Sequence, residues 1–286
     1  MKKKVTVITI NLNNLEGLKR TAESVIAQTS RDFEYIIIDG GSTDGSKEYI
    51  AQLPRVDYWV SEPDKGIYNA MNKGIRMAQG EYCIFMNSGD AFFAPDVLDQ
   101  VIPRLNGGDF YVGQPMLMRD DQMERGHMPD TMTLEFLLED SINHQCTFTR
   151  TAILKESPYN ENRRIVADWE RFFKEWLFRG RSYHPLDITV AYSYLDGISS
   201  TNLETSRKEK AGVIASLVPK DMLEGLRREE DLTPLEWKIR KAMSMPPVRR
   251  DLKLLRNAAK FLAKDAARSL WRKLAALSGR KGGGRG

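Results

Sequence analysis

Apolar runs and amphipathic segments alternate along the first 90 residues of the chain. Short runs rich in β-branched and aromatic residues predict buried strands, at 5–10, 33–38, 56–60 and 82–86. Apolar residues at steps of three and four between these runs predict helices, at 15–28, 46–53 and 67–77. Because strands that alternate with helices form a parallel sheet covered on both faces, the pattern predicts an α/β fold with a doubly wound, mostly parallel sheet.

The pattern is less regular after residue 104, where loops make up most of the chain. Apolar runs predict strands at 110–118 and 188–195, and amphipathic spacing predicts helices at 133–138 and 167–178. Beyond residue 200 the chain is polar and helical, with an interruption at Pro246 and Pro247. We therefore divide the sequence into a regular part, an irregular part, a helical linker and an extension, at 1–104, 105–200, 201–250 and 251–286.

The composition is that of an ordinary globular protein, with 41% hydrophobic and 29% charged residues. No apolar run reaches the roughly 20 residues that cross a bilayer, and the run at 5–10 is too short for a signal peptide. The two cysteines, Cys83 and Cys146, lie in apolar surroundings without metal or redox spacing. We therefore expect no disulfide framework and a cytoplasmic location.

The net charge of +4 conceals a strong asymmetry along the chain. Residues 236–286 hold fifteen Lys and Arg against three acidic side chains. Within 251–277, Leu and Ala recur at helical steps and basic residues occupy the other faces, which predicts a basic amphipathic helix before a disordered glycine-rich end. Such a helix suits an anionic membrane surface, and packing on the domain or on a second subunit is the alternative. No base-reading motif accompanies the charge, so we expect no nucleic-acid partner.

Polar side chains follow the predicted strands at the positions Asn11, Asp39, Asp64 and Asp90. In open α/β sheets, ligands bind beyond the carboxyl ends of the strands, so these side chains predict a binding site. Asp39 can accept hydrogen bonds from a nucleobase N–H or a ribose hydroxyl, although an Asp before two glycines also suits a turn. Asn87 and Asp90 offer oxygen ligands for Mg²⁺ or Mn²⁺, and a helix N-cap is the alternative interpretation of Asp90.

Two other kinds of phosphate site are excluded by the glycine spacing. Gly40, Gly41 and Gly45 do not form the GxGxxG of a dinucleotide fold, and no GxxxxGK[ST] loop occurs in the chain. Carboxylate side chains follow the predicted strands, at the positions where such loops would present backbone N–H groups to phosphate. A bound metal would therefore have to neutralise the phosphates of a ligand.

Four ordered segments resemble family 2 glycosyltransferases, which are inverting enzymes with the GT-A fold. The segments are 7–18, 37–46, 61–74 and 80–90, and the resemblance covers roughly residues 3–200. It is closest to the subgroup that builds bacterial surface polysaccharides, such as the colanic-acid-type transferases. The resemblance implies a GT-A domain at 1–200, with a nucleotide-binding half at 1–104 and an acceptor half at 105–200.

The resemblance also implies a role for each polar residue at the strand ends. Asn11, Asp39 and Asp64 would line the nucleotide pocket, with Asp39 toward the base. The donor would also lie near a second group, which comprises Lys65, Gly66 and Asn87. Asp90 would be the metal ligand of a DxD-type motif in which Gly89 stands where many relatives carry an acid.

An inverting transfer needs one carboxylate that takes the proton from the attacking hydroxyl. The segment 165–170 resembles the acceptor-side acidic motif of the family, and Asp168 matches its base. Glu170 is the alternative base, and a helix cap is the alternative role of Asp168. His144 and Gln145 match a pair that shapes the donor or acceptor pocket. Trp169 belongs to an aromatic set with the spacing of a helix core, and one ring of that set could stack on a sugar.

The sequence therefore predicts an inverting glycosyltransferase that moves a sugar from a UDP- or GDP-sugar with the help of Mg²⁺ or Mn²⁺. The acceptor would be a hydroxyl of a saccharide or lipid-linked molecule in polysaccharide biosynthesis, at the inner face of the cell membrane. One alternative is a GT-A-like nucleotidyltransferase, although the segment after the first strand lacks the basic residues of such enzymes. The other alternative is a catalytically silent carbohydrate-binding or scaffold protein.

Overall fold

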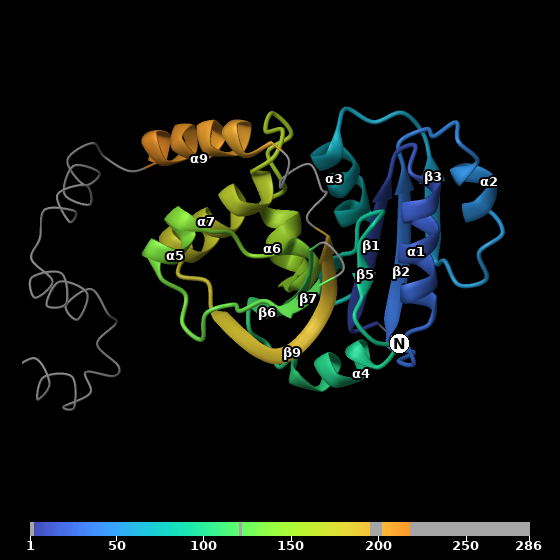
Figure 1. The fold of residues 1–286 in the computed structure, drawn as a ribbon, viewed down its shortest axis with the longest axis horizontal. Helices are drawn as coiled ribbons and strands as arrows, with labels where there is room; N and C mark the ends of the chain where they lie inside the picture. Colours follow the sequence, from blue (N-terminus) through green and yellow to red (C-terminus); the bar gives the residue numbers. More distant parts are fainter. Residues whose placement is uncertain (1–2, 120–121, 195–201, 218–286) are drawn as a thin grey trace, which may run out of the picture. The chain divides into compact units, whose positions relative to one another are not determined.

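The computed structural model describes residues 3–119, 122–194 and 202–217, and within them one mixed sheet of nine strands runs through the protein (Figure 1). The strands are β1 Val5–Asn11, β2 Phe33–Asp39, β3 Tyr58–Ser61, β4 Tyr82–Phe85, β5 Ala91–Phe92, β6 Phe110–Arg119, β7 Gln122–Arg125, β8 Thr147–Arg150 and β9 Tyr183–Tyr194. The α-helices are α1 Leu15–Ile26, α2 Ser46–Ile50, α3 Ile67–Met77, α4 Val97–Val101, α5 Leu134–Glu139, α6 Thr151–Glu156, α7 Ala167–Arg179 and α9 Leu203–Leu217. Two short 3₁₀ helices are η1 Ile102–Arg104 and η2 His144–Cys146.

Residue contacts divide the chain into two units, Met1–Ile214 and Ala215–Gly286. All of the strands above lie in the first unit. The predicted basic amphipathic helix at 251–277 lies outside the described residues, and it stays a prediction.

The first half of the sheet is parallel, in the order β3-β2-β1-β4. Every residue of β1 and β2 is buried, as expected for central strands that are covered on both faces. The register pairs Asn11 with Asp39 and Asp39 with Ser61, so β1, β2 and β3 end together. The alternating strands and helices predicted over residues 5–86 are confirmed, and they bring the polar strand ends to one edge of the sheet.

The second half of the sheet is antiparallel where it joins the first. Strand β8 runs antiparallel to both β4 and β6, while β6 and β9 are parallel to each other. The predicted strand at 188–195 begins five residues earlier, at Tyr183. The sequence did not indicate the start of β9, because Pro185 and Asp187 interrupt the apolar pattern there. The pairing of β9 with β6 is also irregular in this stretch, since its register shifts between Val112 and Gln114.

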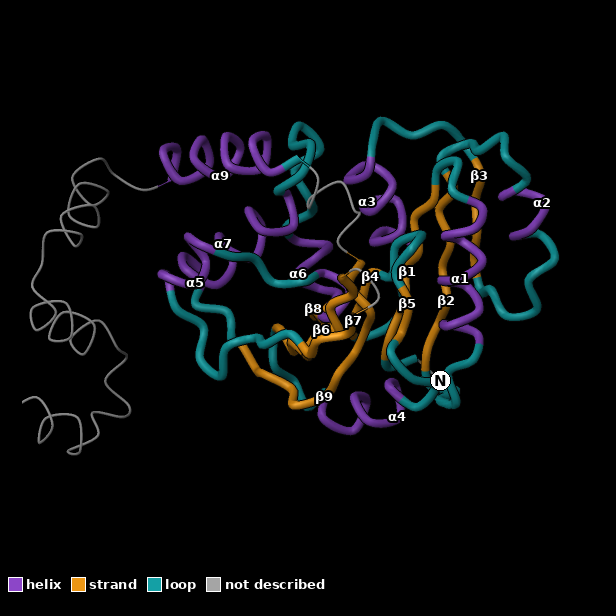
Figure 2. Tube along the Cα trace, in the orientation of Figure 1, coloured by secondary structure: helices purple, strands orange, loops and turns teal. Residues whose placement is uncertain are grey.

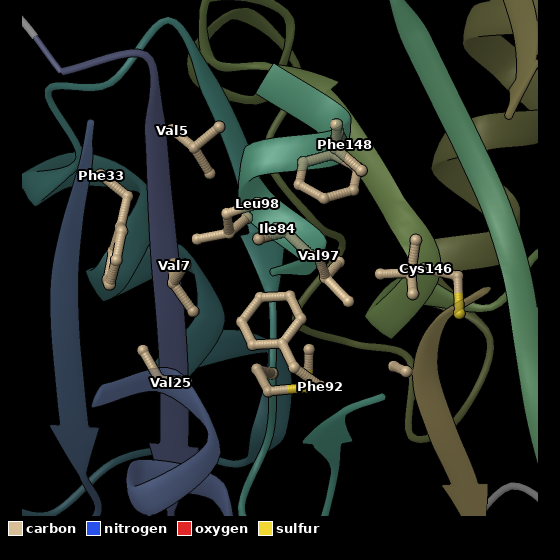
Figure 3. Close-up of a cluster of buried hydrophobic side chains, with 14 of the residues drawn as sticks. Val5, Val7, Val25, Phe33, Ile84, Phe92, Val97, Leu98, Cys146 and Phe148 are labelled. Atoms are coloured by element: carbon tan, nitrogen blue, oxygen red, sulfur yellow. The ribbon is translucent and has the colours of Figure 1, made fainter. Parts of the chain in front are cut away.

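The apolar side chains form one buried cluster on each face of the sheet. The first cluster lies under α1 and α4 and includes Val7, Leu18 and Phe148 (Figure 3). The second includes Ile8 of β1 and Met71 of α3. Neighbouring residues of β1 thus face opposite clusters, as the two-residue period of a strand requires, so α1 and α3 cover opposite faces (Figure 2).

Helix α3 lies unusually close to β1 because it carries a buried glycine at the contact. A Cβ at Gly74 would lie 2.5 Å from Cγ2 of Ile8. We expect Gly74→Ala to force α3 away from the sheet and to lower the free energy of unfolding by about 1–3 kcal/mol. Gly212→Ala in α9 is the matched control, since a Cβ there meets nothing within 4 Å. Thermal unfolding should separate the two variants, and equal midpoints would contradict the close packing of α3.

Candidate functional site

Asp39 lies at the carboxyl end of β2, where its buried carboxylate accepts four hydrogen bonds. Asn11 Nδ2 donates at 2.8 Å and Ser61 Oγ at 2.6 Å, while the backbone N–H and the hydroxyl of Ser42 donate at 2.9 and 2.5 Å. Burial opposes the ionisation of Asp39, but these donors outweigh it and hold its pKa below the ordinary value. The turn interaction expected of Asp39 is therefore present, and its contact with a nucleobase stays a prediction.

The loop before α3 stands against the turn that follows Asp39. A Cβ on Gly40 would lie 2.5 Å from Oδ2 of Asp64. Asp64 Oδ1 in turn accepts a hydrogen bond of 2.8 Å from the N–H of Gly66, whose φ of +116° favours glycine. The candidate nucleotide residues Asn11, Asp39 and Asp64 thus lie together at the carboxyl edge of the sheet.

The turn that carries Asp90 is held by α1. The hydroxyl of Thr21 lies 2.6 Å from the carbonyl oxygen of Asp90 and 3.1 Å from that of Asn87, and it accepts from the N–H of Gly89. Gly89 has a φ of +110°, a left-handed conformation that favours glycine at this position. A two-residue strand, Ala91–Phe92, follows Asp90 instead of a helix, so the N-cap interpretation of Asp90 is wrong.

His144 lies between two carboxylates from different parts of the chain. Its Nε2 is 3.5 Å from Asp90 Oδ2, and its Nδ1 is 3.6 Å from Asp168 Oδ2. Burial favours the neutral ring, but the two carboxylates outweigh it and raise the pKa of His144 to about 10. The ring is therefore an imidazolium at neutral pH, and it bridges Asp90 to Asp168.

Asp168 lies in the first turn of α7, and the cap position of that helix belongs to Val166. The carboxylate accepts from the N–H of Trp169 at 2.8 Å and from the hydroxyl of Tyr68 at 3.3 Å. Burial raises the pKa of Asp168, but His144, the Trp169 amide and Tyr68 outweigh it, so the pKa is lowered. The helix-cap interpretation of Asp168 is wrong, and the carboxylate is ionised beside the imidazolium.

The carboxylate of Glu170, the alternative base, forms ion pairs with two basic side chains. Its side chain is 5% exposed and pairs with Arg163 Nε and Lys174 Nζ, each at 2.6 Å. Burial opposes ionisation of Glu170, but Arg163 and Lys174 keep its pKa low. These ion pairs favour Asp168 over Glu170 as the carboxylate that is free to meet an acceptor.

The other acceptor-side candidates are buried. Trp169 is 2% exposed, stacks on Phe173 at 5.0 Å and donates from Nε1 to the carbonyl oxygen of Leu137. Gln145 is 7% exposed within η2. Both residues can shape a pocket through packing, and Trp169 offers no open ring face for a sugar.

Helix α3 makes contacts to residues 159–165 that the sequence did not indicate. Asn72 Nδ2 donates to the carbonyl oxygen of Tyr159 and to Glu161 Oε1, both at 2.9 Å. Asn69 donates to Glu161, and the hydroxyl of Tyr68 donates to the carbonyl oxygen of Ile165. The only hint in the sequence is the polar Asn72 on the buried face of α3.

The residues at Asp90 fit a hard divalent cation. Asn87 Oδ1 is buried without a hydrogen-bond partner in the described structure, while Nδ2 lies 3.0 Å from His144 Nε2. A charged imidazole can only donate, so the amide can present its oxygen either to the ring or to a cation beside Asp90. Within the described ranges no three His, Cys, Asp or Glu form a closed metal cage. Mg²⁺ and Mn²⁺ often take one or two carboxylates plus ligand phosphates, which one Asp and one Asn can support.

Comparison with known proteins gives matches in sequence. The model of glycosyl transferase family 2 matches residues 6–164. An uncharacterized glycosyltransferase of Mycobacterium tuberculosis is 38% identical over 174 residues, which span 58% of this chain and 66% of that protein. A PGL/p-HBAD biosynthesis glycosyltransferase of Mycobacterium bovis is 30% identical over 208 residues, with 68% and 79% of the two chains covered.

Solved structures match the fold. Staphylococcus aureus TarS in complex with UDP-GlcNAc has a TM-score of 0.58 and 16% identity, covering 82% of this chain and 78% of that one. A mannosyltransferase from Pyrobaculum calidifontis, in complex with GDP-Man and Mn²⁺, has a TM-score of 0.58 and 17% identity, covering 98% and 82%. This likeness shows the GT-A type of fold, a mixed α/β structure with a mostly parallel sheet.

The position of His144 predicts its titration in the metal-free protein. The ring should stay protonated beyond pH 8, because the pKa rises from 6.5 to about 10. The contribution of the charged ring to the free energy of unfolding should be complete below pH 6.5 and should be lost as the pH rises toward 10. The gap in unfolding free energy between the parent protein and His144→Asn should therefore shrink over that window. Histidine NMR, with the same variant to assign the signal, measures the midpoint, and a value near 6.5 would contradict the bridge.

Proposed function

The chain belongs to glycosyl transferase family 2, and we propose that it transfers a sugar with inversion from a nucleoside diphosphate sugar to a hydroxyl group. One observation carries the proposal. Asp90 of the first half and Asp168 of the second half both lie within 3.6 Å of His144, so a metal ligand and a general base flank one site.

The donor nucleotide would lie over the carboxyl ends of β1 and β2. Asn11 and Asp39 would form the floor of its pocket, and the loop Asp64-Lys65-Gly66 would line one wall. Asp39 would act chiefly by fixing the turn, since its four protein donors already engage both oxygens. The complexes of similar folds with UDP-GlcNAc and with GDP-Man support a nucleotide-sugar donor.

Asp90 and Asn87 would hold a Mg²⁺ or Mn²⁺ ion. Such a cation neutralises the charge that develops on the leaving diphosphate without any proton transfer. The Mn²⁺ in the mannosyltransferase complex supports this assignment. The imidazolium of His144 lies beside the carboxylate of Asp90, so the protein itself also contributes a positive charge at this site.

Asp168 would act as the general base. As the acceptor oxygen forms its bond to the anomeric carbon, the carboxylate takes the hydroxyl proton, and the bond to the diphosphate breaks on the opposite face of the sugar. The lowered pKa of Asp168 keeps the carboxylate ionised at neutral pH. Tyr68 and the Trp169 amide both bind Oδ1, and Oδ2 faces His144, so that the carboxylate is oriented before the acceptor arrives.

The acceptor would be a saccharide or lipid-linked hydroxyl in polysaccharide biosynthesis. The relative named for PGL/p-HBAD biosynthesis supports a biosynthetic transfer. The helices that the structure describes include none long and apolar enough to span a membrane. The basic extension at 251–286 supports a cytoplasmic enzyme that meets an anionic membrane surface, because its charge attracts acidic headgroups.

The role of Asp168 predicts a specific loss of turnover. Asp168→Asn keeps the size of the side chain but cannot accept the proton, so we expect kcat to fall about 10²–10⁴-fold with little change in the KM of the donor. Release of nucleoside diphosphate from a panel of UDP- and GDP-sugars measures this.

Asp99→Asn in the first turn of α4 is the control for Asp168→Asn, and it should keep parent activity. Full turnover by Asp168→Asn would remove the proposed base. Pyrophosphate as the product, instead of the nucleoside diphosphate, would indicate a nucleotidyltransferase.

A further inference from the structure

Helix α9 lies beyond the family match at 6–164, yet it contacts the two segments that precede Asp168 and His144. In Figure 2 it runs beside α5 and α7, and hydrogen bonds join it to the chain at 164–166 and at Asp140. Two adjacent residues of α9, Glu209 and Lys210, make these bonds.

Glu209 binds three backbone amides of the segment that leads into α7. One carboxylate oxygen accepts from the N–H of Arg164 at 2.8 Å, and the other accepts from Ile165 at 2.9 Å and Val166 at 3.2 Å. The cap residue of α7, Val166, has no side chain that could do this. Two of these amides, Arg164 and Ile165, precede α7 and the third belongs to its cap residue, so a residue more than 40 positions later holds the segment that leads into the helix.

Lys210 holds the chain ahead of His144. Its Nζ donates to the carbonyl oxygen of Asp140 at 3.0 Å, just after α5 ends, and lies 5.1 Å from the centre of the Trp169 ring. Asp140 is four residues before His144, and Trp169 directly follows Asp168. Lys210 therefore contacts the chain four residues before His144 and also the side chain that directly follows Asp168.

The same base segment is held from its other side by α3. Tyr68 donates to the carbonyl oxygen of Ile165, while Asn72 binds Tyr159 and Glu161. Ile165 is thus fixed at its carbonyl by α3 and at its amide by Glu209 of α9. Two helices far apart in the sequence thus bind the N–H and the carbonyl group of one residue, three positions before the base.

We propose that Glu209 is a positioning residue for the transfer, assisted by Lys210. By binding the amides at 164–166, Glu209 fixes the first turn of α7 and so sets the distance from Asp168 to His144 and to the attacking hydroxyl. A shift of about 1 Å in such a group can cost about 10²-fold in rate. The inference rests on the proposed role of Asp168 as the base.

The test compares two substitutions of the same kind on one helix, in the full-length protein. Glu209→Gln keeps the shape of the side chain but replaces one of its two accepting oxygens with an NH2 group, which cannot accept from a backbone N–H. Glu204→Gln is the control, because Glu204 is exposed and forms an ion pair with Lys208 of the same helix. Glu209→Ala is a second variant that removes the group.

Two readouts are needed, one of which is independent of activity. Amide hydrogen exchange at 164–166 should become at least about tenfold faster in both Glu209 variants and should not change in Glu204→Gln. In the same preparations, kcat should fall about 10- to 100-fold while the KM of the donor stays within about twofold. A loss confined to kcat marks positioning, because general unfolding would lower the active fraction and the melting temperature together.

The outcomes separate this inference from the proposed function. If Glu209→Gln turns over like Glu204→Gln while Asp168→Asn is inactive, the positioning role is overturned and the base assignment stands. If Asp168→Asn is active, the base assignment fails whatever the Glu209 variants do. A fall in kcat that follows only the folded fraction would also overturn the positioning role, whereas faster exchange with a loss confined to kcat would support it.

Discussion

One imidazolium shared by two carboxylates is the interaction on which the rest of the site depends. Asp90 and Asp168 come from opposite halves of the protein, and their negative charges would repel each other in a partly buried site without a cation between them. His144 supplies that cation, and the two carboxylates in turn keep it protonated. The charges therefore stabilise one another, and each half of the protein is fixed relative to the other through this bridge.

Helix α3 gives the bridge a rigid support. Its N-terminal end carries the Asp64–Gly66 loop at the carboxyl edge, and its polar side chains bind the segment before Asp168. Gly74 lets the helix lie directly against β1, so its position is set by the core of the sheet. A single helix of 11 residues thus connects the candidate donor pocket to the candidate base, and packing in the core determines the geometry of both.

The regular half of the fold was predictable because its strands are buried on both faces. Strands β1 and β2 are rich in β-branched and aromatic residues and are fully buried, and α3 has the predicted bounds, Ile67–Met77. In the second half of the sheet, β7 and β8 each contain one large apolar residue and β5 has only two residues, so none of them forms the apolar run that marks the first strands. The predicted helix at 46–53 ends at Ile50, and the strand predicted at 56–60 is Tyr58–Ser61.

The candidate site was predictable only where a residue follows a strand or matches a family motif. Asp39 ends β2, Asp90 lies beyond β4, and Asp168 and His144 match a motif, so the sequence indicated all four as candidates. Tyr68, Asn72 and Glu209 were missed, because a hydrogen bond between residues 40 to 100 positions apart leaves no periodic signal in the chain. In a sequence, polar side chains on a helix predict a solvent-exposed face. Only the structure shows which of them contact another segment.

The convergence of Asp90 and Asp168 on one ligand is the central claim, and a crystal structure with bound nucleoside diphosphate sugar and Mn²⁺ tests it most directly. The account predicts that the cation contacts Asp90 and the diphosphate at the carboxyl ends of β1 and β4, with the sugar between that cation and Asp168. Binding of the nucleotide elsewhere would contradict the account. One such place is the cavity of about 500 Å³ lined by Arg125, His127 and Asp187.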